Sequence, residues 1–447
     1  MRPVFRDEAA KENSAGRNEP NRLTRSRGQE VLRNLPSHGR RCTCFCFDEF
    51  VKTTDETRPA GFGALLWLAL ATFSMGIDGY VLAGLLPQIA GDLDVAEAAA
   101  GQLVAVFALT AAIAGPVLSS VTGRWERKLV ISLSLAVFVL GNLLIAVSVN
   151  YAMAMTGRIV SALGGSLLSA VVSAYVLAKT APERRGRALS FVLGGFLAAT
   201  ALGVPVGLVI GQDDWRLPLF LVTGVGAVAL IGILINVPRL HLPALTLRQT
   251  LSPLGRPAVI GSIFVATGIM CASYLCFTYA TLIFGPRVGE GAPIIAAMFG
   301  YGIVSLGGNI LSGRITDRID PKTVIALIIG ILIVVALLGT AGLLLPGVGG
   351  AVAAFAWFFG CAFFNGGSGV ALQSRLGDIA PDSMSLVLAL NGSGMQLGSA
   401  LGGILGGLLL ASGVPADGLV PASAVVLAVT MGLHLLVSRA AQRVPVA

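Results

Sequence analysis

Charged side chains are scarce in this chain of 447 residues. Asp, Glu, Lys and Arg make up 12% of it, whereas hydrophobic residues make up 55%. Soluble domains carry about 25% charged residues, which keep their surfaces hydrated. The mean hydropathy of +0.82 agrees with this shortage. These values exclude a soluble protein and indicate a chain that crosses the membrane several times.

Aromatic rings and metal ligands are also few. Phe, Trp and Tyr together make up 7% of the chain, which holds three His and six Cys. So few rings argue against an aromatic cage for cationic drugs and favour neutral or small polar ligands. Cys42, Cys44 and Cys46 form C-x-C-x-C, but no second Cys pair or His cluster completes a zinc site. We expect no metal and no cofactor, because the Gly-rich runs lie in apolar segments where they pack helices.

The first 60 residues differ from the rest of the chain. They hold 12 Lys and Arg and 9 Asp and Glu, and no apolar run long enough to cross a membrane. We interpret residues 1–60 as a disordered cytosolic extension without a site of its own. The net charge of +8 is explained by membrane topology, so we expect no nucleic-acid partner.

Twelve apolar segments follow, each about the 20 residues that a helix needs to cross a bilayer. They predict an all-α polytopic membrane protein. The predicted spans are 63–86, 98–121, 129–149, 152–176, 189–210, 217–235, 259–284, 293–312, 324–345, 348–372, 386–411 and 420–437.

Basic residues in the connecting loops predict the orientation. The loops on one side hold 16 Lys and Arg, and those on the other side hold only Arg216 and Arg287. Positive loops face the cytoplasm. We therefore expect both termini, and a tail at 439–447, to be cytoplasmic.

The chain also divides into two similar halves. A Pro-rich connection at 237–257 separates a six-span unit at 61–236 from another at 258–438. The second and third spans of each half are joined by related segments, S-S-V-T-G-R-W-E-R-K from Ser119 and G-R-I-T-D-R-I-D-P-K from Gly313, offset by 194 residues. Such repeats are typical of transporters with a site near the midplane between the halves.

Two ionisable residues lie inside predicted spans. Asp78 is the one acid within the first span, and Arg158 lies in the fourth. Buried ionisable groups are costly and commonly face a partner or a functional cavity. Low dielectric disfavours a charged carboxylate, so Asp78 is our candidate proton carrier. A static Asp78–Arg158 pair, or an Arg158 that reaches the interface, remains the alternative.

The fifth span contains Gly203, Pro205 and Gly207 in the pattern G-x-P-x-G. Proline removes a backbone donor and permits a kink, and the two glycines allow close helix approach. The spacing therefore indicates a bendable helix, with an ordinary packing helix as the alternative.

From Gly63 to about Arg439 the chain resembles the major facilitator superfamily, most closely its twelve-span bacterial drug:proton antiporters of the arabinose-efflux and chloramphenicol-efflux type. The resemblance implies roles in proton coupling for Asp78 and Arg158, and an antiport helix motif at Gly203, Pro205 and Gly207. It also implies cytoplasmic loop motifs, of which the first copy lacks the family's acid. These motifs comprise Arg124, Arg127, Lys128, Gly313, Asp317, Arg318 and Lys322.

The expected function is secondary active transport, not enzymatic catalysis. We predict a monomeric, multi-pass protein of the bacterial cytoplasmic membrane that exports small molecules such as drugs in exchange for protons. Export or exchange of sugars or other metabolites, without drug resistance, is the alternative.

Deletion of residues 1–60 tests the interpretation of the extension. Because the segment has no span and holds 21 of the 54 charged residues, the truncated protein should insert and transport like the full chain. The measurements are membrane yield and transport rate in cells. Loss of the inserted protein on truncation would contradict this prediction.

Overall fold

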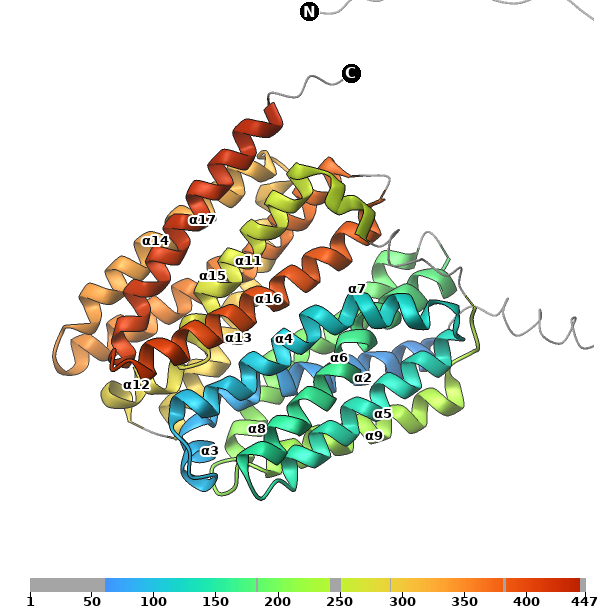
Figure 1. Cartoon of the computed structure of the whole chain (residues 1–447), viewed down its shortest axis with the longest axis horizontal. Helices are drawn as coiled ribbons and strands as arrows, with labels where there is room; N and C mark the ends of the chain where they lie inside the picture. The colour runs from blue at the N-terminus through green and yellow to red at the C-terminus, as the bar shows by residue number, and fades with distance from the viewer. Residues whose placement is uncertain (1–60, 182–183, 242–250, 290, 381–382, 443–447) are drawn as a thin grey trace, which may run out of the picture. The chain divides into compact units, whose positions relative to one another are not determined.

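The computed structural model describes residues 61–181, 184–241, 251–289, 291–380 and 383–442, and every regular element in these ranges is helical. Twelve helical segments are long and apolar enough to cross a membrane. The predicted all-α polytopic fold is therefore confirmed (Figure 1). The predicted extension at 1–60, and residues 242–250 of the predicted connection at 237–257, lie outside the described residues.

The first group of helices runs from Phe62 to Asn236. It consists of α2 (Phe62–Gly84), α3 (Leu86–Asp92), α4 (Glu97–Val121), α5 (Arg127–Ala146), α6 (Tyr151–Lys179), α7 (Arg185–Ala198), α8 (Val204–Ile210) and α9 (Leu217–Asn236). The predicted fifth span is not one regular helix, because a π-helical segment, η3 (Ala199–Gly203), joins α7 to α8.

The second group runs from Pro257 to Gln442. It consists of α11 (Pro257–Phe277), α12 (Ala280–Val288), α13 (Ala292–Thr316), α14 (Pro321–Leu343), α15 (Gly347–Ile379), α16 (Met384–Ala411) and α17 (Leu419–Gln442). The predicted seventh span is broken between α11 and α12. Helix α17 continues to Gln442, and the cytoplasmic tail at 439–447 remains a prediction.

Most helix contacts are made within each group. In the first group α2 packs against α7 and α9, and α5 packs against α6 and α9; in the second, α11 packs against α16 and α17, and α13 and α14 pack against α15 (Figure 1). Contacts of α4 with α16, and of α8 and η3 with α13, join the groups. The division into two six-helix units that move separately remains a prediction.

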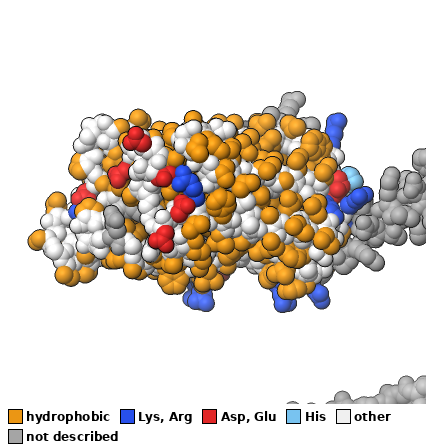
Figure 2. All heavy atoms as spheres, turned by 90° about the horizontal axis from the view of Figure 1, so that it is seen from below, with side chains coloured by type: hydrophobic (Ala, Val, Ile, Leu, Met, Phe, Trp, Pro, Cys, Tyr) orange, Lys and Arg blue, Asp and Glu red, His pale blue; other side chains and the backbone are white. Residues whose placement is uncertain are grey.

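The outer surface is strongly hydrophobic. Figure 2 shows hydrophobic side chains over most of the visible face, with acidic and basic side chains gathered toward its ends. Large side chains such as Val429, Leu338 and Ile235 are 70%, 67% and 74% exposed. Because large apolar areas are rarely left in contact with water, this surface suits a hydrocarbon environment.

The 194-residue repeat recurs as a helix cap. The Glu126 carboxylate accepts a hydrogen bond from the Lys128 backbone N–H at 2.8 Å, at the start of α5. The Asp320 carboxylate accepts one from the Lys322 backbone N–H at 2.9 Å, at the start of α14. This bond, aided by the Lys322 ammonium, lowers the pKa of Asp320. The same cap therefore begins the third span of each group.

Two arginines counted as loop residues are buried in helices. Arg127 begins α5 and is 8% exposed, and its Nη2 donates to the Gly123 carbonyl at 3.0 Å. Arg375 is 3% exposed because α15 extends to Ile379, beyond the predicted end at 372. The count of basic residues assigns both arginines to loops. In the structure α5 begins at Arg127 and α15 continues past Arg375, so both side chains are packed against other helices.

Glycine allows α5 and α6 to lie in close contact. A Cβ at Gly141 would lie 2.6 Å from the Cα of Ser161, and one at Gly164 would lie 2.9 Å from the Cα of Phe138. Real Cβ atoms do not approach backbone this closely, so only glycine permits this helix spacing.

We predict that Gly141→Ala destabilises the protein by about 1–3 kcal/mol, as overpacking does in other cores. Gly224→Ala in α9 is the matched control, because a Cβ there would meet nothing within 4 Å. Thermal unfolding in detergent should show a lower melting temperature for the first variant only. Equal melting temperatures would show that the two helices can separate without cost.

Candidate functional site

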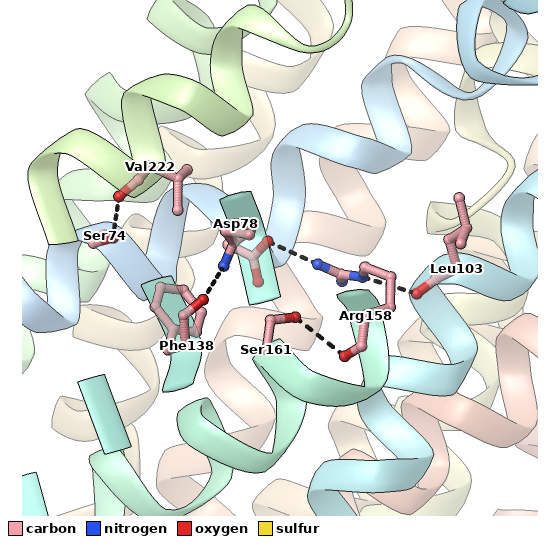
Figure 3. A network of polar contacts seen from close by, with 8 residues as sticks. Ser74, Asp78, Leu103, Phe138, Arg158, Ser161 and Val222 are labelled. Carbon is pink, nitrogen blue, oxygen red and sulfur yellow. Dashed lines mark hydrogen bonds and ion pairs between the residues drawn. The ribbon is translucent and has the colours of Figure 1, made fainter. Parts of the chain in front are cut away.

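A buried ion pair lies inside the first group of helices. The Arg158 Nη1 on α6 is 2.7 Å from the Asp78 Oδ1 on α2. The two side chains are 1% and 0% exposed. Figure 3 shows the guanidinium between the carboxylate and the Leu103 carbonyl. The two ionisable residues singled out within predicted spans are therefore in direct contact.

The arginine is held on several sides, but the carboxylate is not. Arg158 Nε donates to the Leu103 carbonyl on α4 at 3.0 Å, and the guanidinium carbon lies 4.4 Å from the centre of the Phe107 ring. Asp78 Oδ2 is buried and has no hydrogen-bond partner within the described residues. One carboxylate oxygen is thus neutralised by arginine, and the other is available to a proton.

Polar groups from neighbouring helices surround the pair. The Ser161 hydroxyl donates to the Arg158 carbonyl at 3.1 Å, and the Ser74 hydroxyl donates to the Val222 carbonyl at 2.9 Å (Figure 3). Asn142 on α5 is fully buried, and its Nδ2 donates to its own helix. Sequence analysis did not single out Asn142, although an amide inside an apolar span is a signal that could have identified it.

The G-x-P-x-G motif packs against the helix that carries Asp78. Gly203 faces Ile77 so closely that a Cβ would lie 2.9 Å from the Ile77 Cδ1, and a Cβ at Gly207 would lie 2.8 Å from the Val81 Cγ2. Pro205 is in the first turn of α8, directly after the π-helical segment η3. Residues 77 and 81 flank Asp78, so a shift of this segment acts directly on α2.

The same segment touches the second group of helices. A Cβ at Gly302 on α13 would lie 2.8 Å from the carbonyl oxygen of Thr200 in η3. The irregular turn is therefore packed between α2 and α13. π-helical turns are frequently found at functional sites, since they displace the following residues.

The predicted loop motifs lie apart from the ion pair. Arg124 is exposed and Arg127 is buried. In the second copy, the Lys322 Nζ lies 3.4 Å from Asp320. The side chains of Asp317 and Arg318 are exposed and join no ion pair within the described part of the chain.

Four aromatic residues gather where the two groups of helices meet. Tyr80 on α2 lies 5.5 Å from Phe277 on α11, measured between ring centroids. Phe277 lies 5.7 Å from Tyr274 and 5.0 Å from Tyr301 on α13. We call these four residues the tyrosine cluster. Low aromatic content did not predict such a concentration, because rings from three helices converge there.

A second buried cation lies near the start of α14. Arg375 Nη1 is 3.3 Å from His434 Nδ1 and 3.2 Å from the Ser438 hydroxyl. The other nitrogen of His434 lies 3.0 Å from the Lys322 carbonyl. This arrangement ties α15 and α17 to the second loop motif.

Comparisons with known proteins agree with this fold. Residues 68–365 match the sequence profile of the Major Facilitator Superfamily. An uncharacterized MFS-type transporter of Bacillus subtilis, YfhI, is 27% identical over 361 residues, covering 77% of this chain and 86% of that protein. The inner membrane transport protein YdhP of Escherichia coli is 27% identical over 82% of this chain and 95% of its own length.

A third relative has a name that states an activity. The chloramphenicol resistance protein of Streptomyces lividans is 28% identical over 59% of this chain and 68% of its own length. A solved bacterial homologue of the human lysosomal transporter Spinster has a TM-score of 0.68 at 17% identity, covering 84% of this chain and 96% of that one. The profile match spans more than half of the sequence, and the chain therefore belongs to the Major Facilitator Superfamily of membrane transporters.

Proposed function

We propose that this transporter exports small molecules in exchange for protons, with Asp78 as the proton carrier and Arg158 as its partner. The observation that carries the proposal is a fully buried carboxylate with one oxygen on an arginine and the other without a hydrogen bond. The basic loops would face the cytoplasm, and so would both termini. The protein would act as a monomer in a bacterial cytoplasmic membrane.

Protonation of Asp78 would change the charge of the site. With Asp78 ionised, the buried pair is neutral overall. A proton on Asp78 would leave the Arg158 cation without a counter-charge, and an unpaired buried charge costs about 3–5 kcal/mol. The protein can avoid this cost by moving Arg158 toward water or toward another acceptor. A proton would therefore favour a different arrangement of α2 and α6, which is what coupling requires.

The antiport motif would carry this rearrangement between the two groups of helices. Gly203 and Gly207 contact the residues beside Asp78, and Thr200 contacts Gly302 of α13. An irregular η3 turn can shift with less loss of hydrogen bonding than a regular helix. We infer that α8 and η3 slide on α2 when the transporter changes which side it opens.

The relatives favour export over exchange of metabolites. The chloramphenicol resistance protein carries drug resistance in its name. Metabolite or sugar exchange remains the second candidate, since the names of YfhI and YdhP state no substrate. Chloramphenicol susceptibility of cells that express the protein, with and without an uncoupler, separates the two.

We predict that Asp78→Asn abolishes proton release driven by chloramphenicol in reconstituted vesicles, while chloramphenicol still binds. The amide keeps the shape of the carboxylate but cannot titrate. A pH-sensitive dye inside the vesicles measures the release. Asp92→Asn is the matched control. Asp92 lies at the end of α3, outside the helix that carries Asp78, is 42% exposed and pairs with Arg216.

The single variant also leaves Arg158 without a counter-charge. Should Asp78→Asn fold poorly, the double variant Asp78→Asn with Arg158→Gln removes both charges and serves in its place. Proton release that persists in a folded variant without the Asp78 carboxylate would rule out Asp78 as the carrier. The static ion pair would then be the better description.

We predict that Gly207→Leu stops transport with little loss of expressed protein. The added side chain would collide with Val81 whenever α8 slides on α2. Gly194→Leu, in α7 of the same span, is the control, since a Cβ there meets nothing within 4 Å. Transport by Gly207→Leu at the wild-type rate would show that the glycine is only a packing residue.

A further inference from the structure

The tyrosine cluster has the properties of a binding surface. Its three tyrosines are partly exposed, whereas Phe277 between them is 4% exposed. Tyr80 comes from the first group of helices, and the other three come from the second. A molecule held there would touch both groups, which is the position that alternating access requires of a substrate.

The chemistry of the cluster is aromatic and polar but uncharged. The Tyr80 hydroxyl interacts with that of Tyr274, which also faces Ser399. The Tyr301 hydroxyl interacts with Asn365, whose Oδ1 is buried and makes no hydrogen bond within the described residues. Rings offer stacking surfaces, and hydroxyl and amide groups both donate and accept hydrogen bonds.

A small cavity continues behind the cluster. It has a volume of about 30 Å³ and is lined by Phe277 and Tyr301, together with Trp357, Phe358 and Ser423. Trp357 is 3% exposed, and its indole N–H has no partner within the described part of the chain. The cavity thus adds an unused donor, and its described lining carries no charged side chain.

The acid lies on the other side of α2. Successive residues of an α-helix are rotated by about 100°, so Tyr80 points roughly 200° away from Asp78. Asp78 faces Arg158 inside the first group, and Tyr80 faces Phe277 of the second. A molecule on the tyrosine cluster would therefore not reach the carboxylate.

We propose that Tyr80, Tyr274 and Tyr301 bind the substrate, that the substrates are neutral aromatic molecules with hydroxyl or amide groups, and that substrate and proton occupy opposite faces of α2. The proposal rests on the proposed function and adds the substrate class to it. Within the described residues no carboxylate belongs to this cluster, so a permanent cation would be attracted only by the ring faces. We therefore expect lipophilic cations to bind less tightly than neutral molecules.

Contiguous contacts connect the two sites. Tyr301 precedes Gly302, which packs against Thr200 of η3, and Gly203 at the end of η3 packs against Ile77 beside Asp78. A substrate that moves Tyr301 therefore displaces the antiport motif, which displaces the helix of the acid. Coupling through packing of this kind needs no competition between substrate and proton for one group.

Equilibrium binding to the purified full-length protein in detergent tests the proposal. The probes are radiolabelled chloramphenicol, a neutral nitroaromatic diol with an amide, and tetraphenylphosphonium, an aromatic cation. Wild-type protein should bind the first more tightly than the second. Tyr80→Phe, Tyr274→Phe and Tyr301→Phe should each raise the Kd for chloramphenicol by roughly threefold to tenfold, the effect of one lost hydrogen bond.

Two controls separate a binding role from a structural one. Tyr175→Phe loses a hydroxyl that donates to the Pro238 carbonyl at 2.9 Å, far along the chain from the cluster, and should leave the Kd unchanged. Asp92→Asn removes a carboxylate that is 42% exposed and pairs with Arg216, and it should keep the Kd within about twofold of wild type.

Each result decides between these proposals. Absence of saturable chloramphenicol binding to folded wild-type protein, tighter binding of tetraphenylphosphonium than of chloramphenicol, or unchanged affinity in all three Tyr→Phe variants overturns the substrate site. An equal loss of chloramphenicol affinity in Tyr175→Phe and in the cluster variants marks the effect as structural and also overturns it. Normal binding without proton release in wild-type vesicles refutes the proton coupling and leaves the substrate site standing.

Discussion

The charge balance between Asp78 and Arg158 is the constraint on which the rest of the site depends. Neither side chain reaches water, and their 2.7 Å contact joins two spans that are far apart in sequence. In a low dielectric, a buried charge is tolerated only beside its opposite. In the proposed mechanism, a proton gained by Asp78 would leave Arg158 unpaired, and movement of the surrounding helices would relieve that cost, so that a local titration becomes a change of helix packing.

Helix packing would suit such movement in the proposed mechanism, because glycine lies where α8 and η3 would slide on α2 and α13. Gly203 and Gly207 lie on the α2 contact beside the acid, and Gly302 lies on the contact with the second group. Tyr279, in contrast, fills the space left by Gly101 and Gly406 and donates to the Gly403 carbonyl at 2.9 Å, locking α4 against α16. The glycine contacts of α8 and η3 would therefore let these segments shift, while the side chain of Tyr279 would keep α4 and α16 together.

The sequence predicted the elements better than their interruptions. Long apolar runs bounded by charge are sufficient to find twelve spans, since hydrocarbon thickness sets their length. The π turn before Pro205 and the burial of Arg375 were not predictable, because they depend on partners such as Thr200–Gly302 and His434 that lie 102 and 59 residues away. Asp78 and Arg158 could be identified because each is a costly residue in an apolar span, but only their three-dimensional arrangement joins them.

The tyrosine cluster shows why composition alone was a poor guide to the ligand. A content of 7% aromatic residues suggests few rings for any substrate. Yet the ring centroids of Tyr80 on α2 and Tyr301 on α13 lie 5.5 Å and 5.0 Å from that of Phe277 on α11. The absence of a carboxylate among them within the described chain, not the number of rings, is what disfavours cations. The position of Asp78 on the opposite face of α2 then allows a neutral substrate to be coupled to a proton, since the two bind one helix without sharing a group.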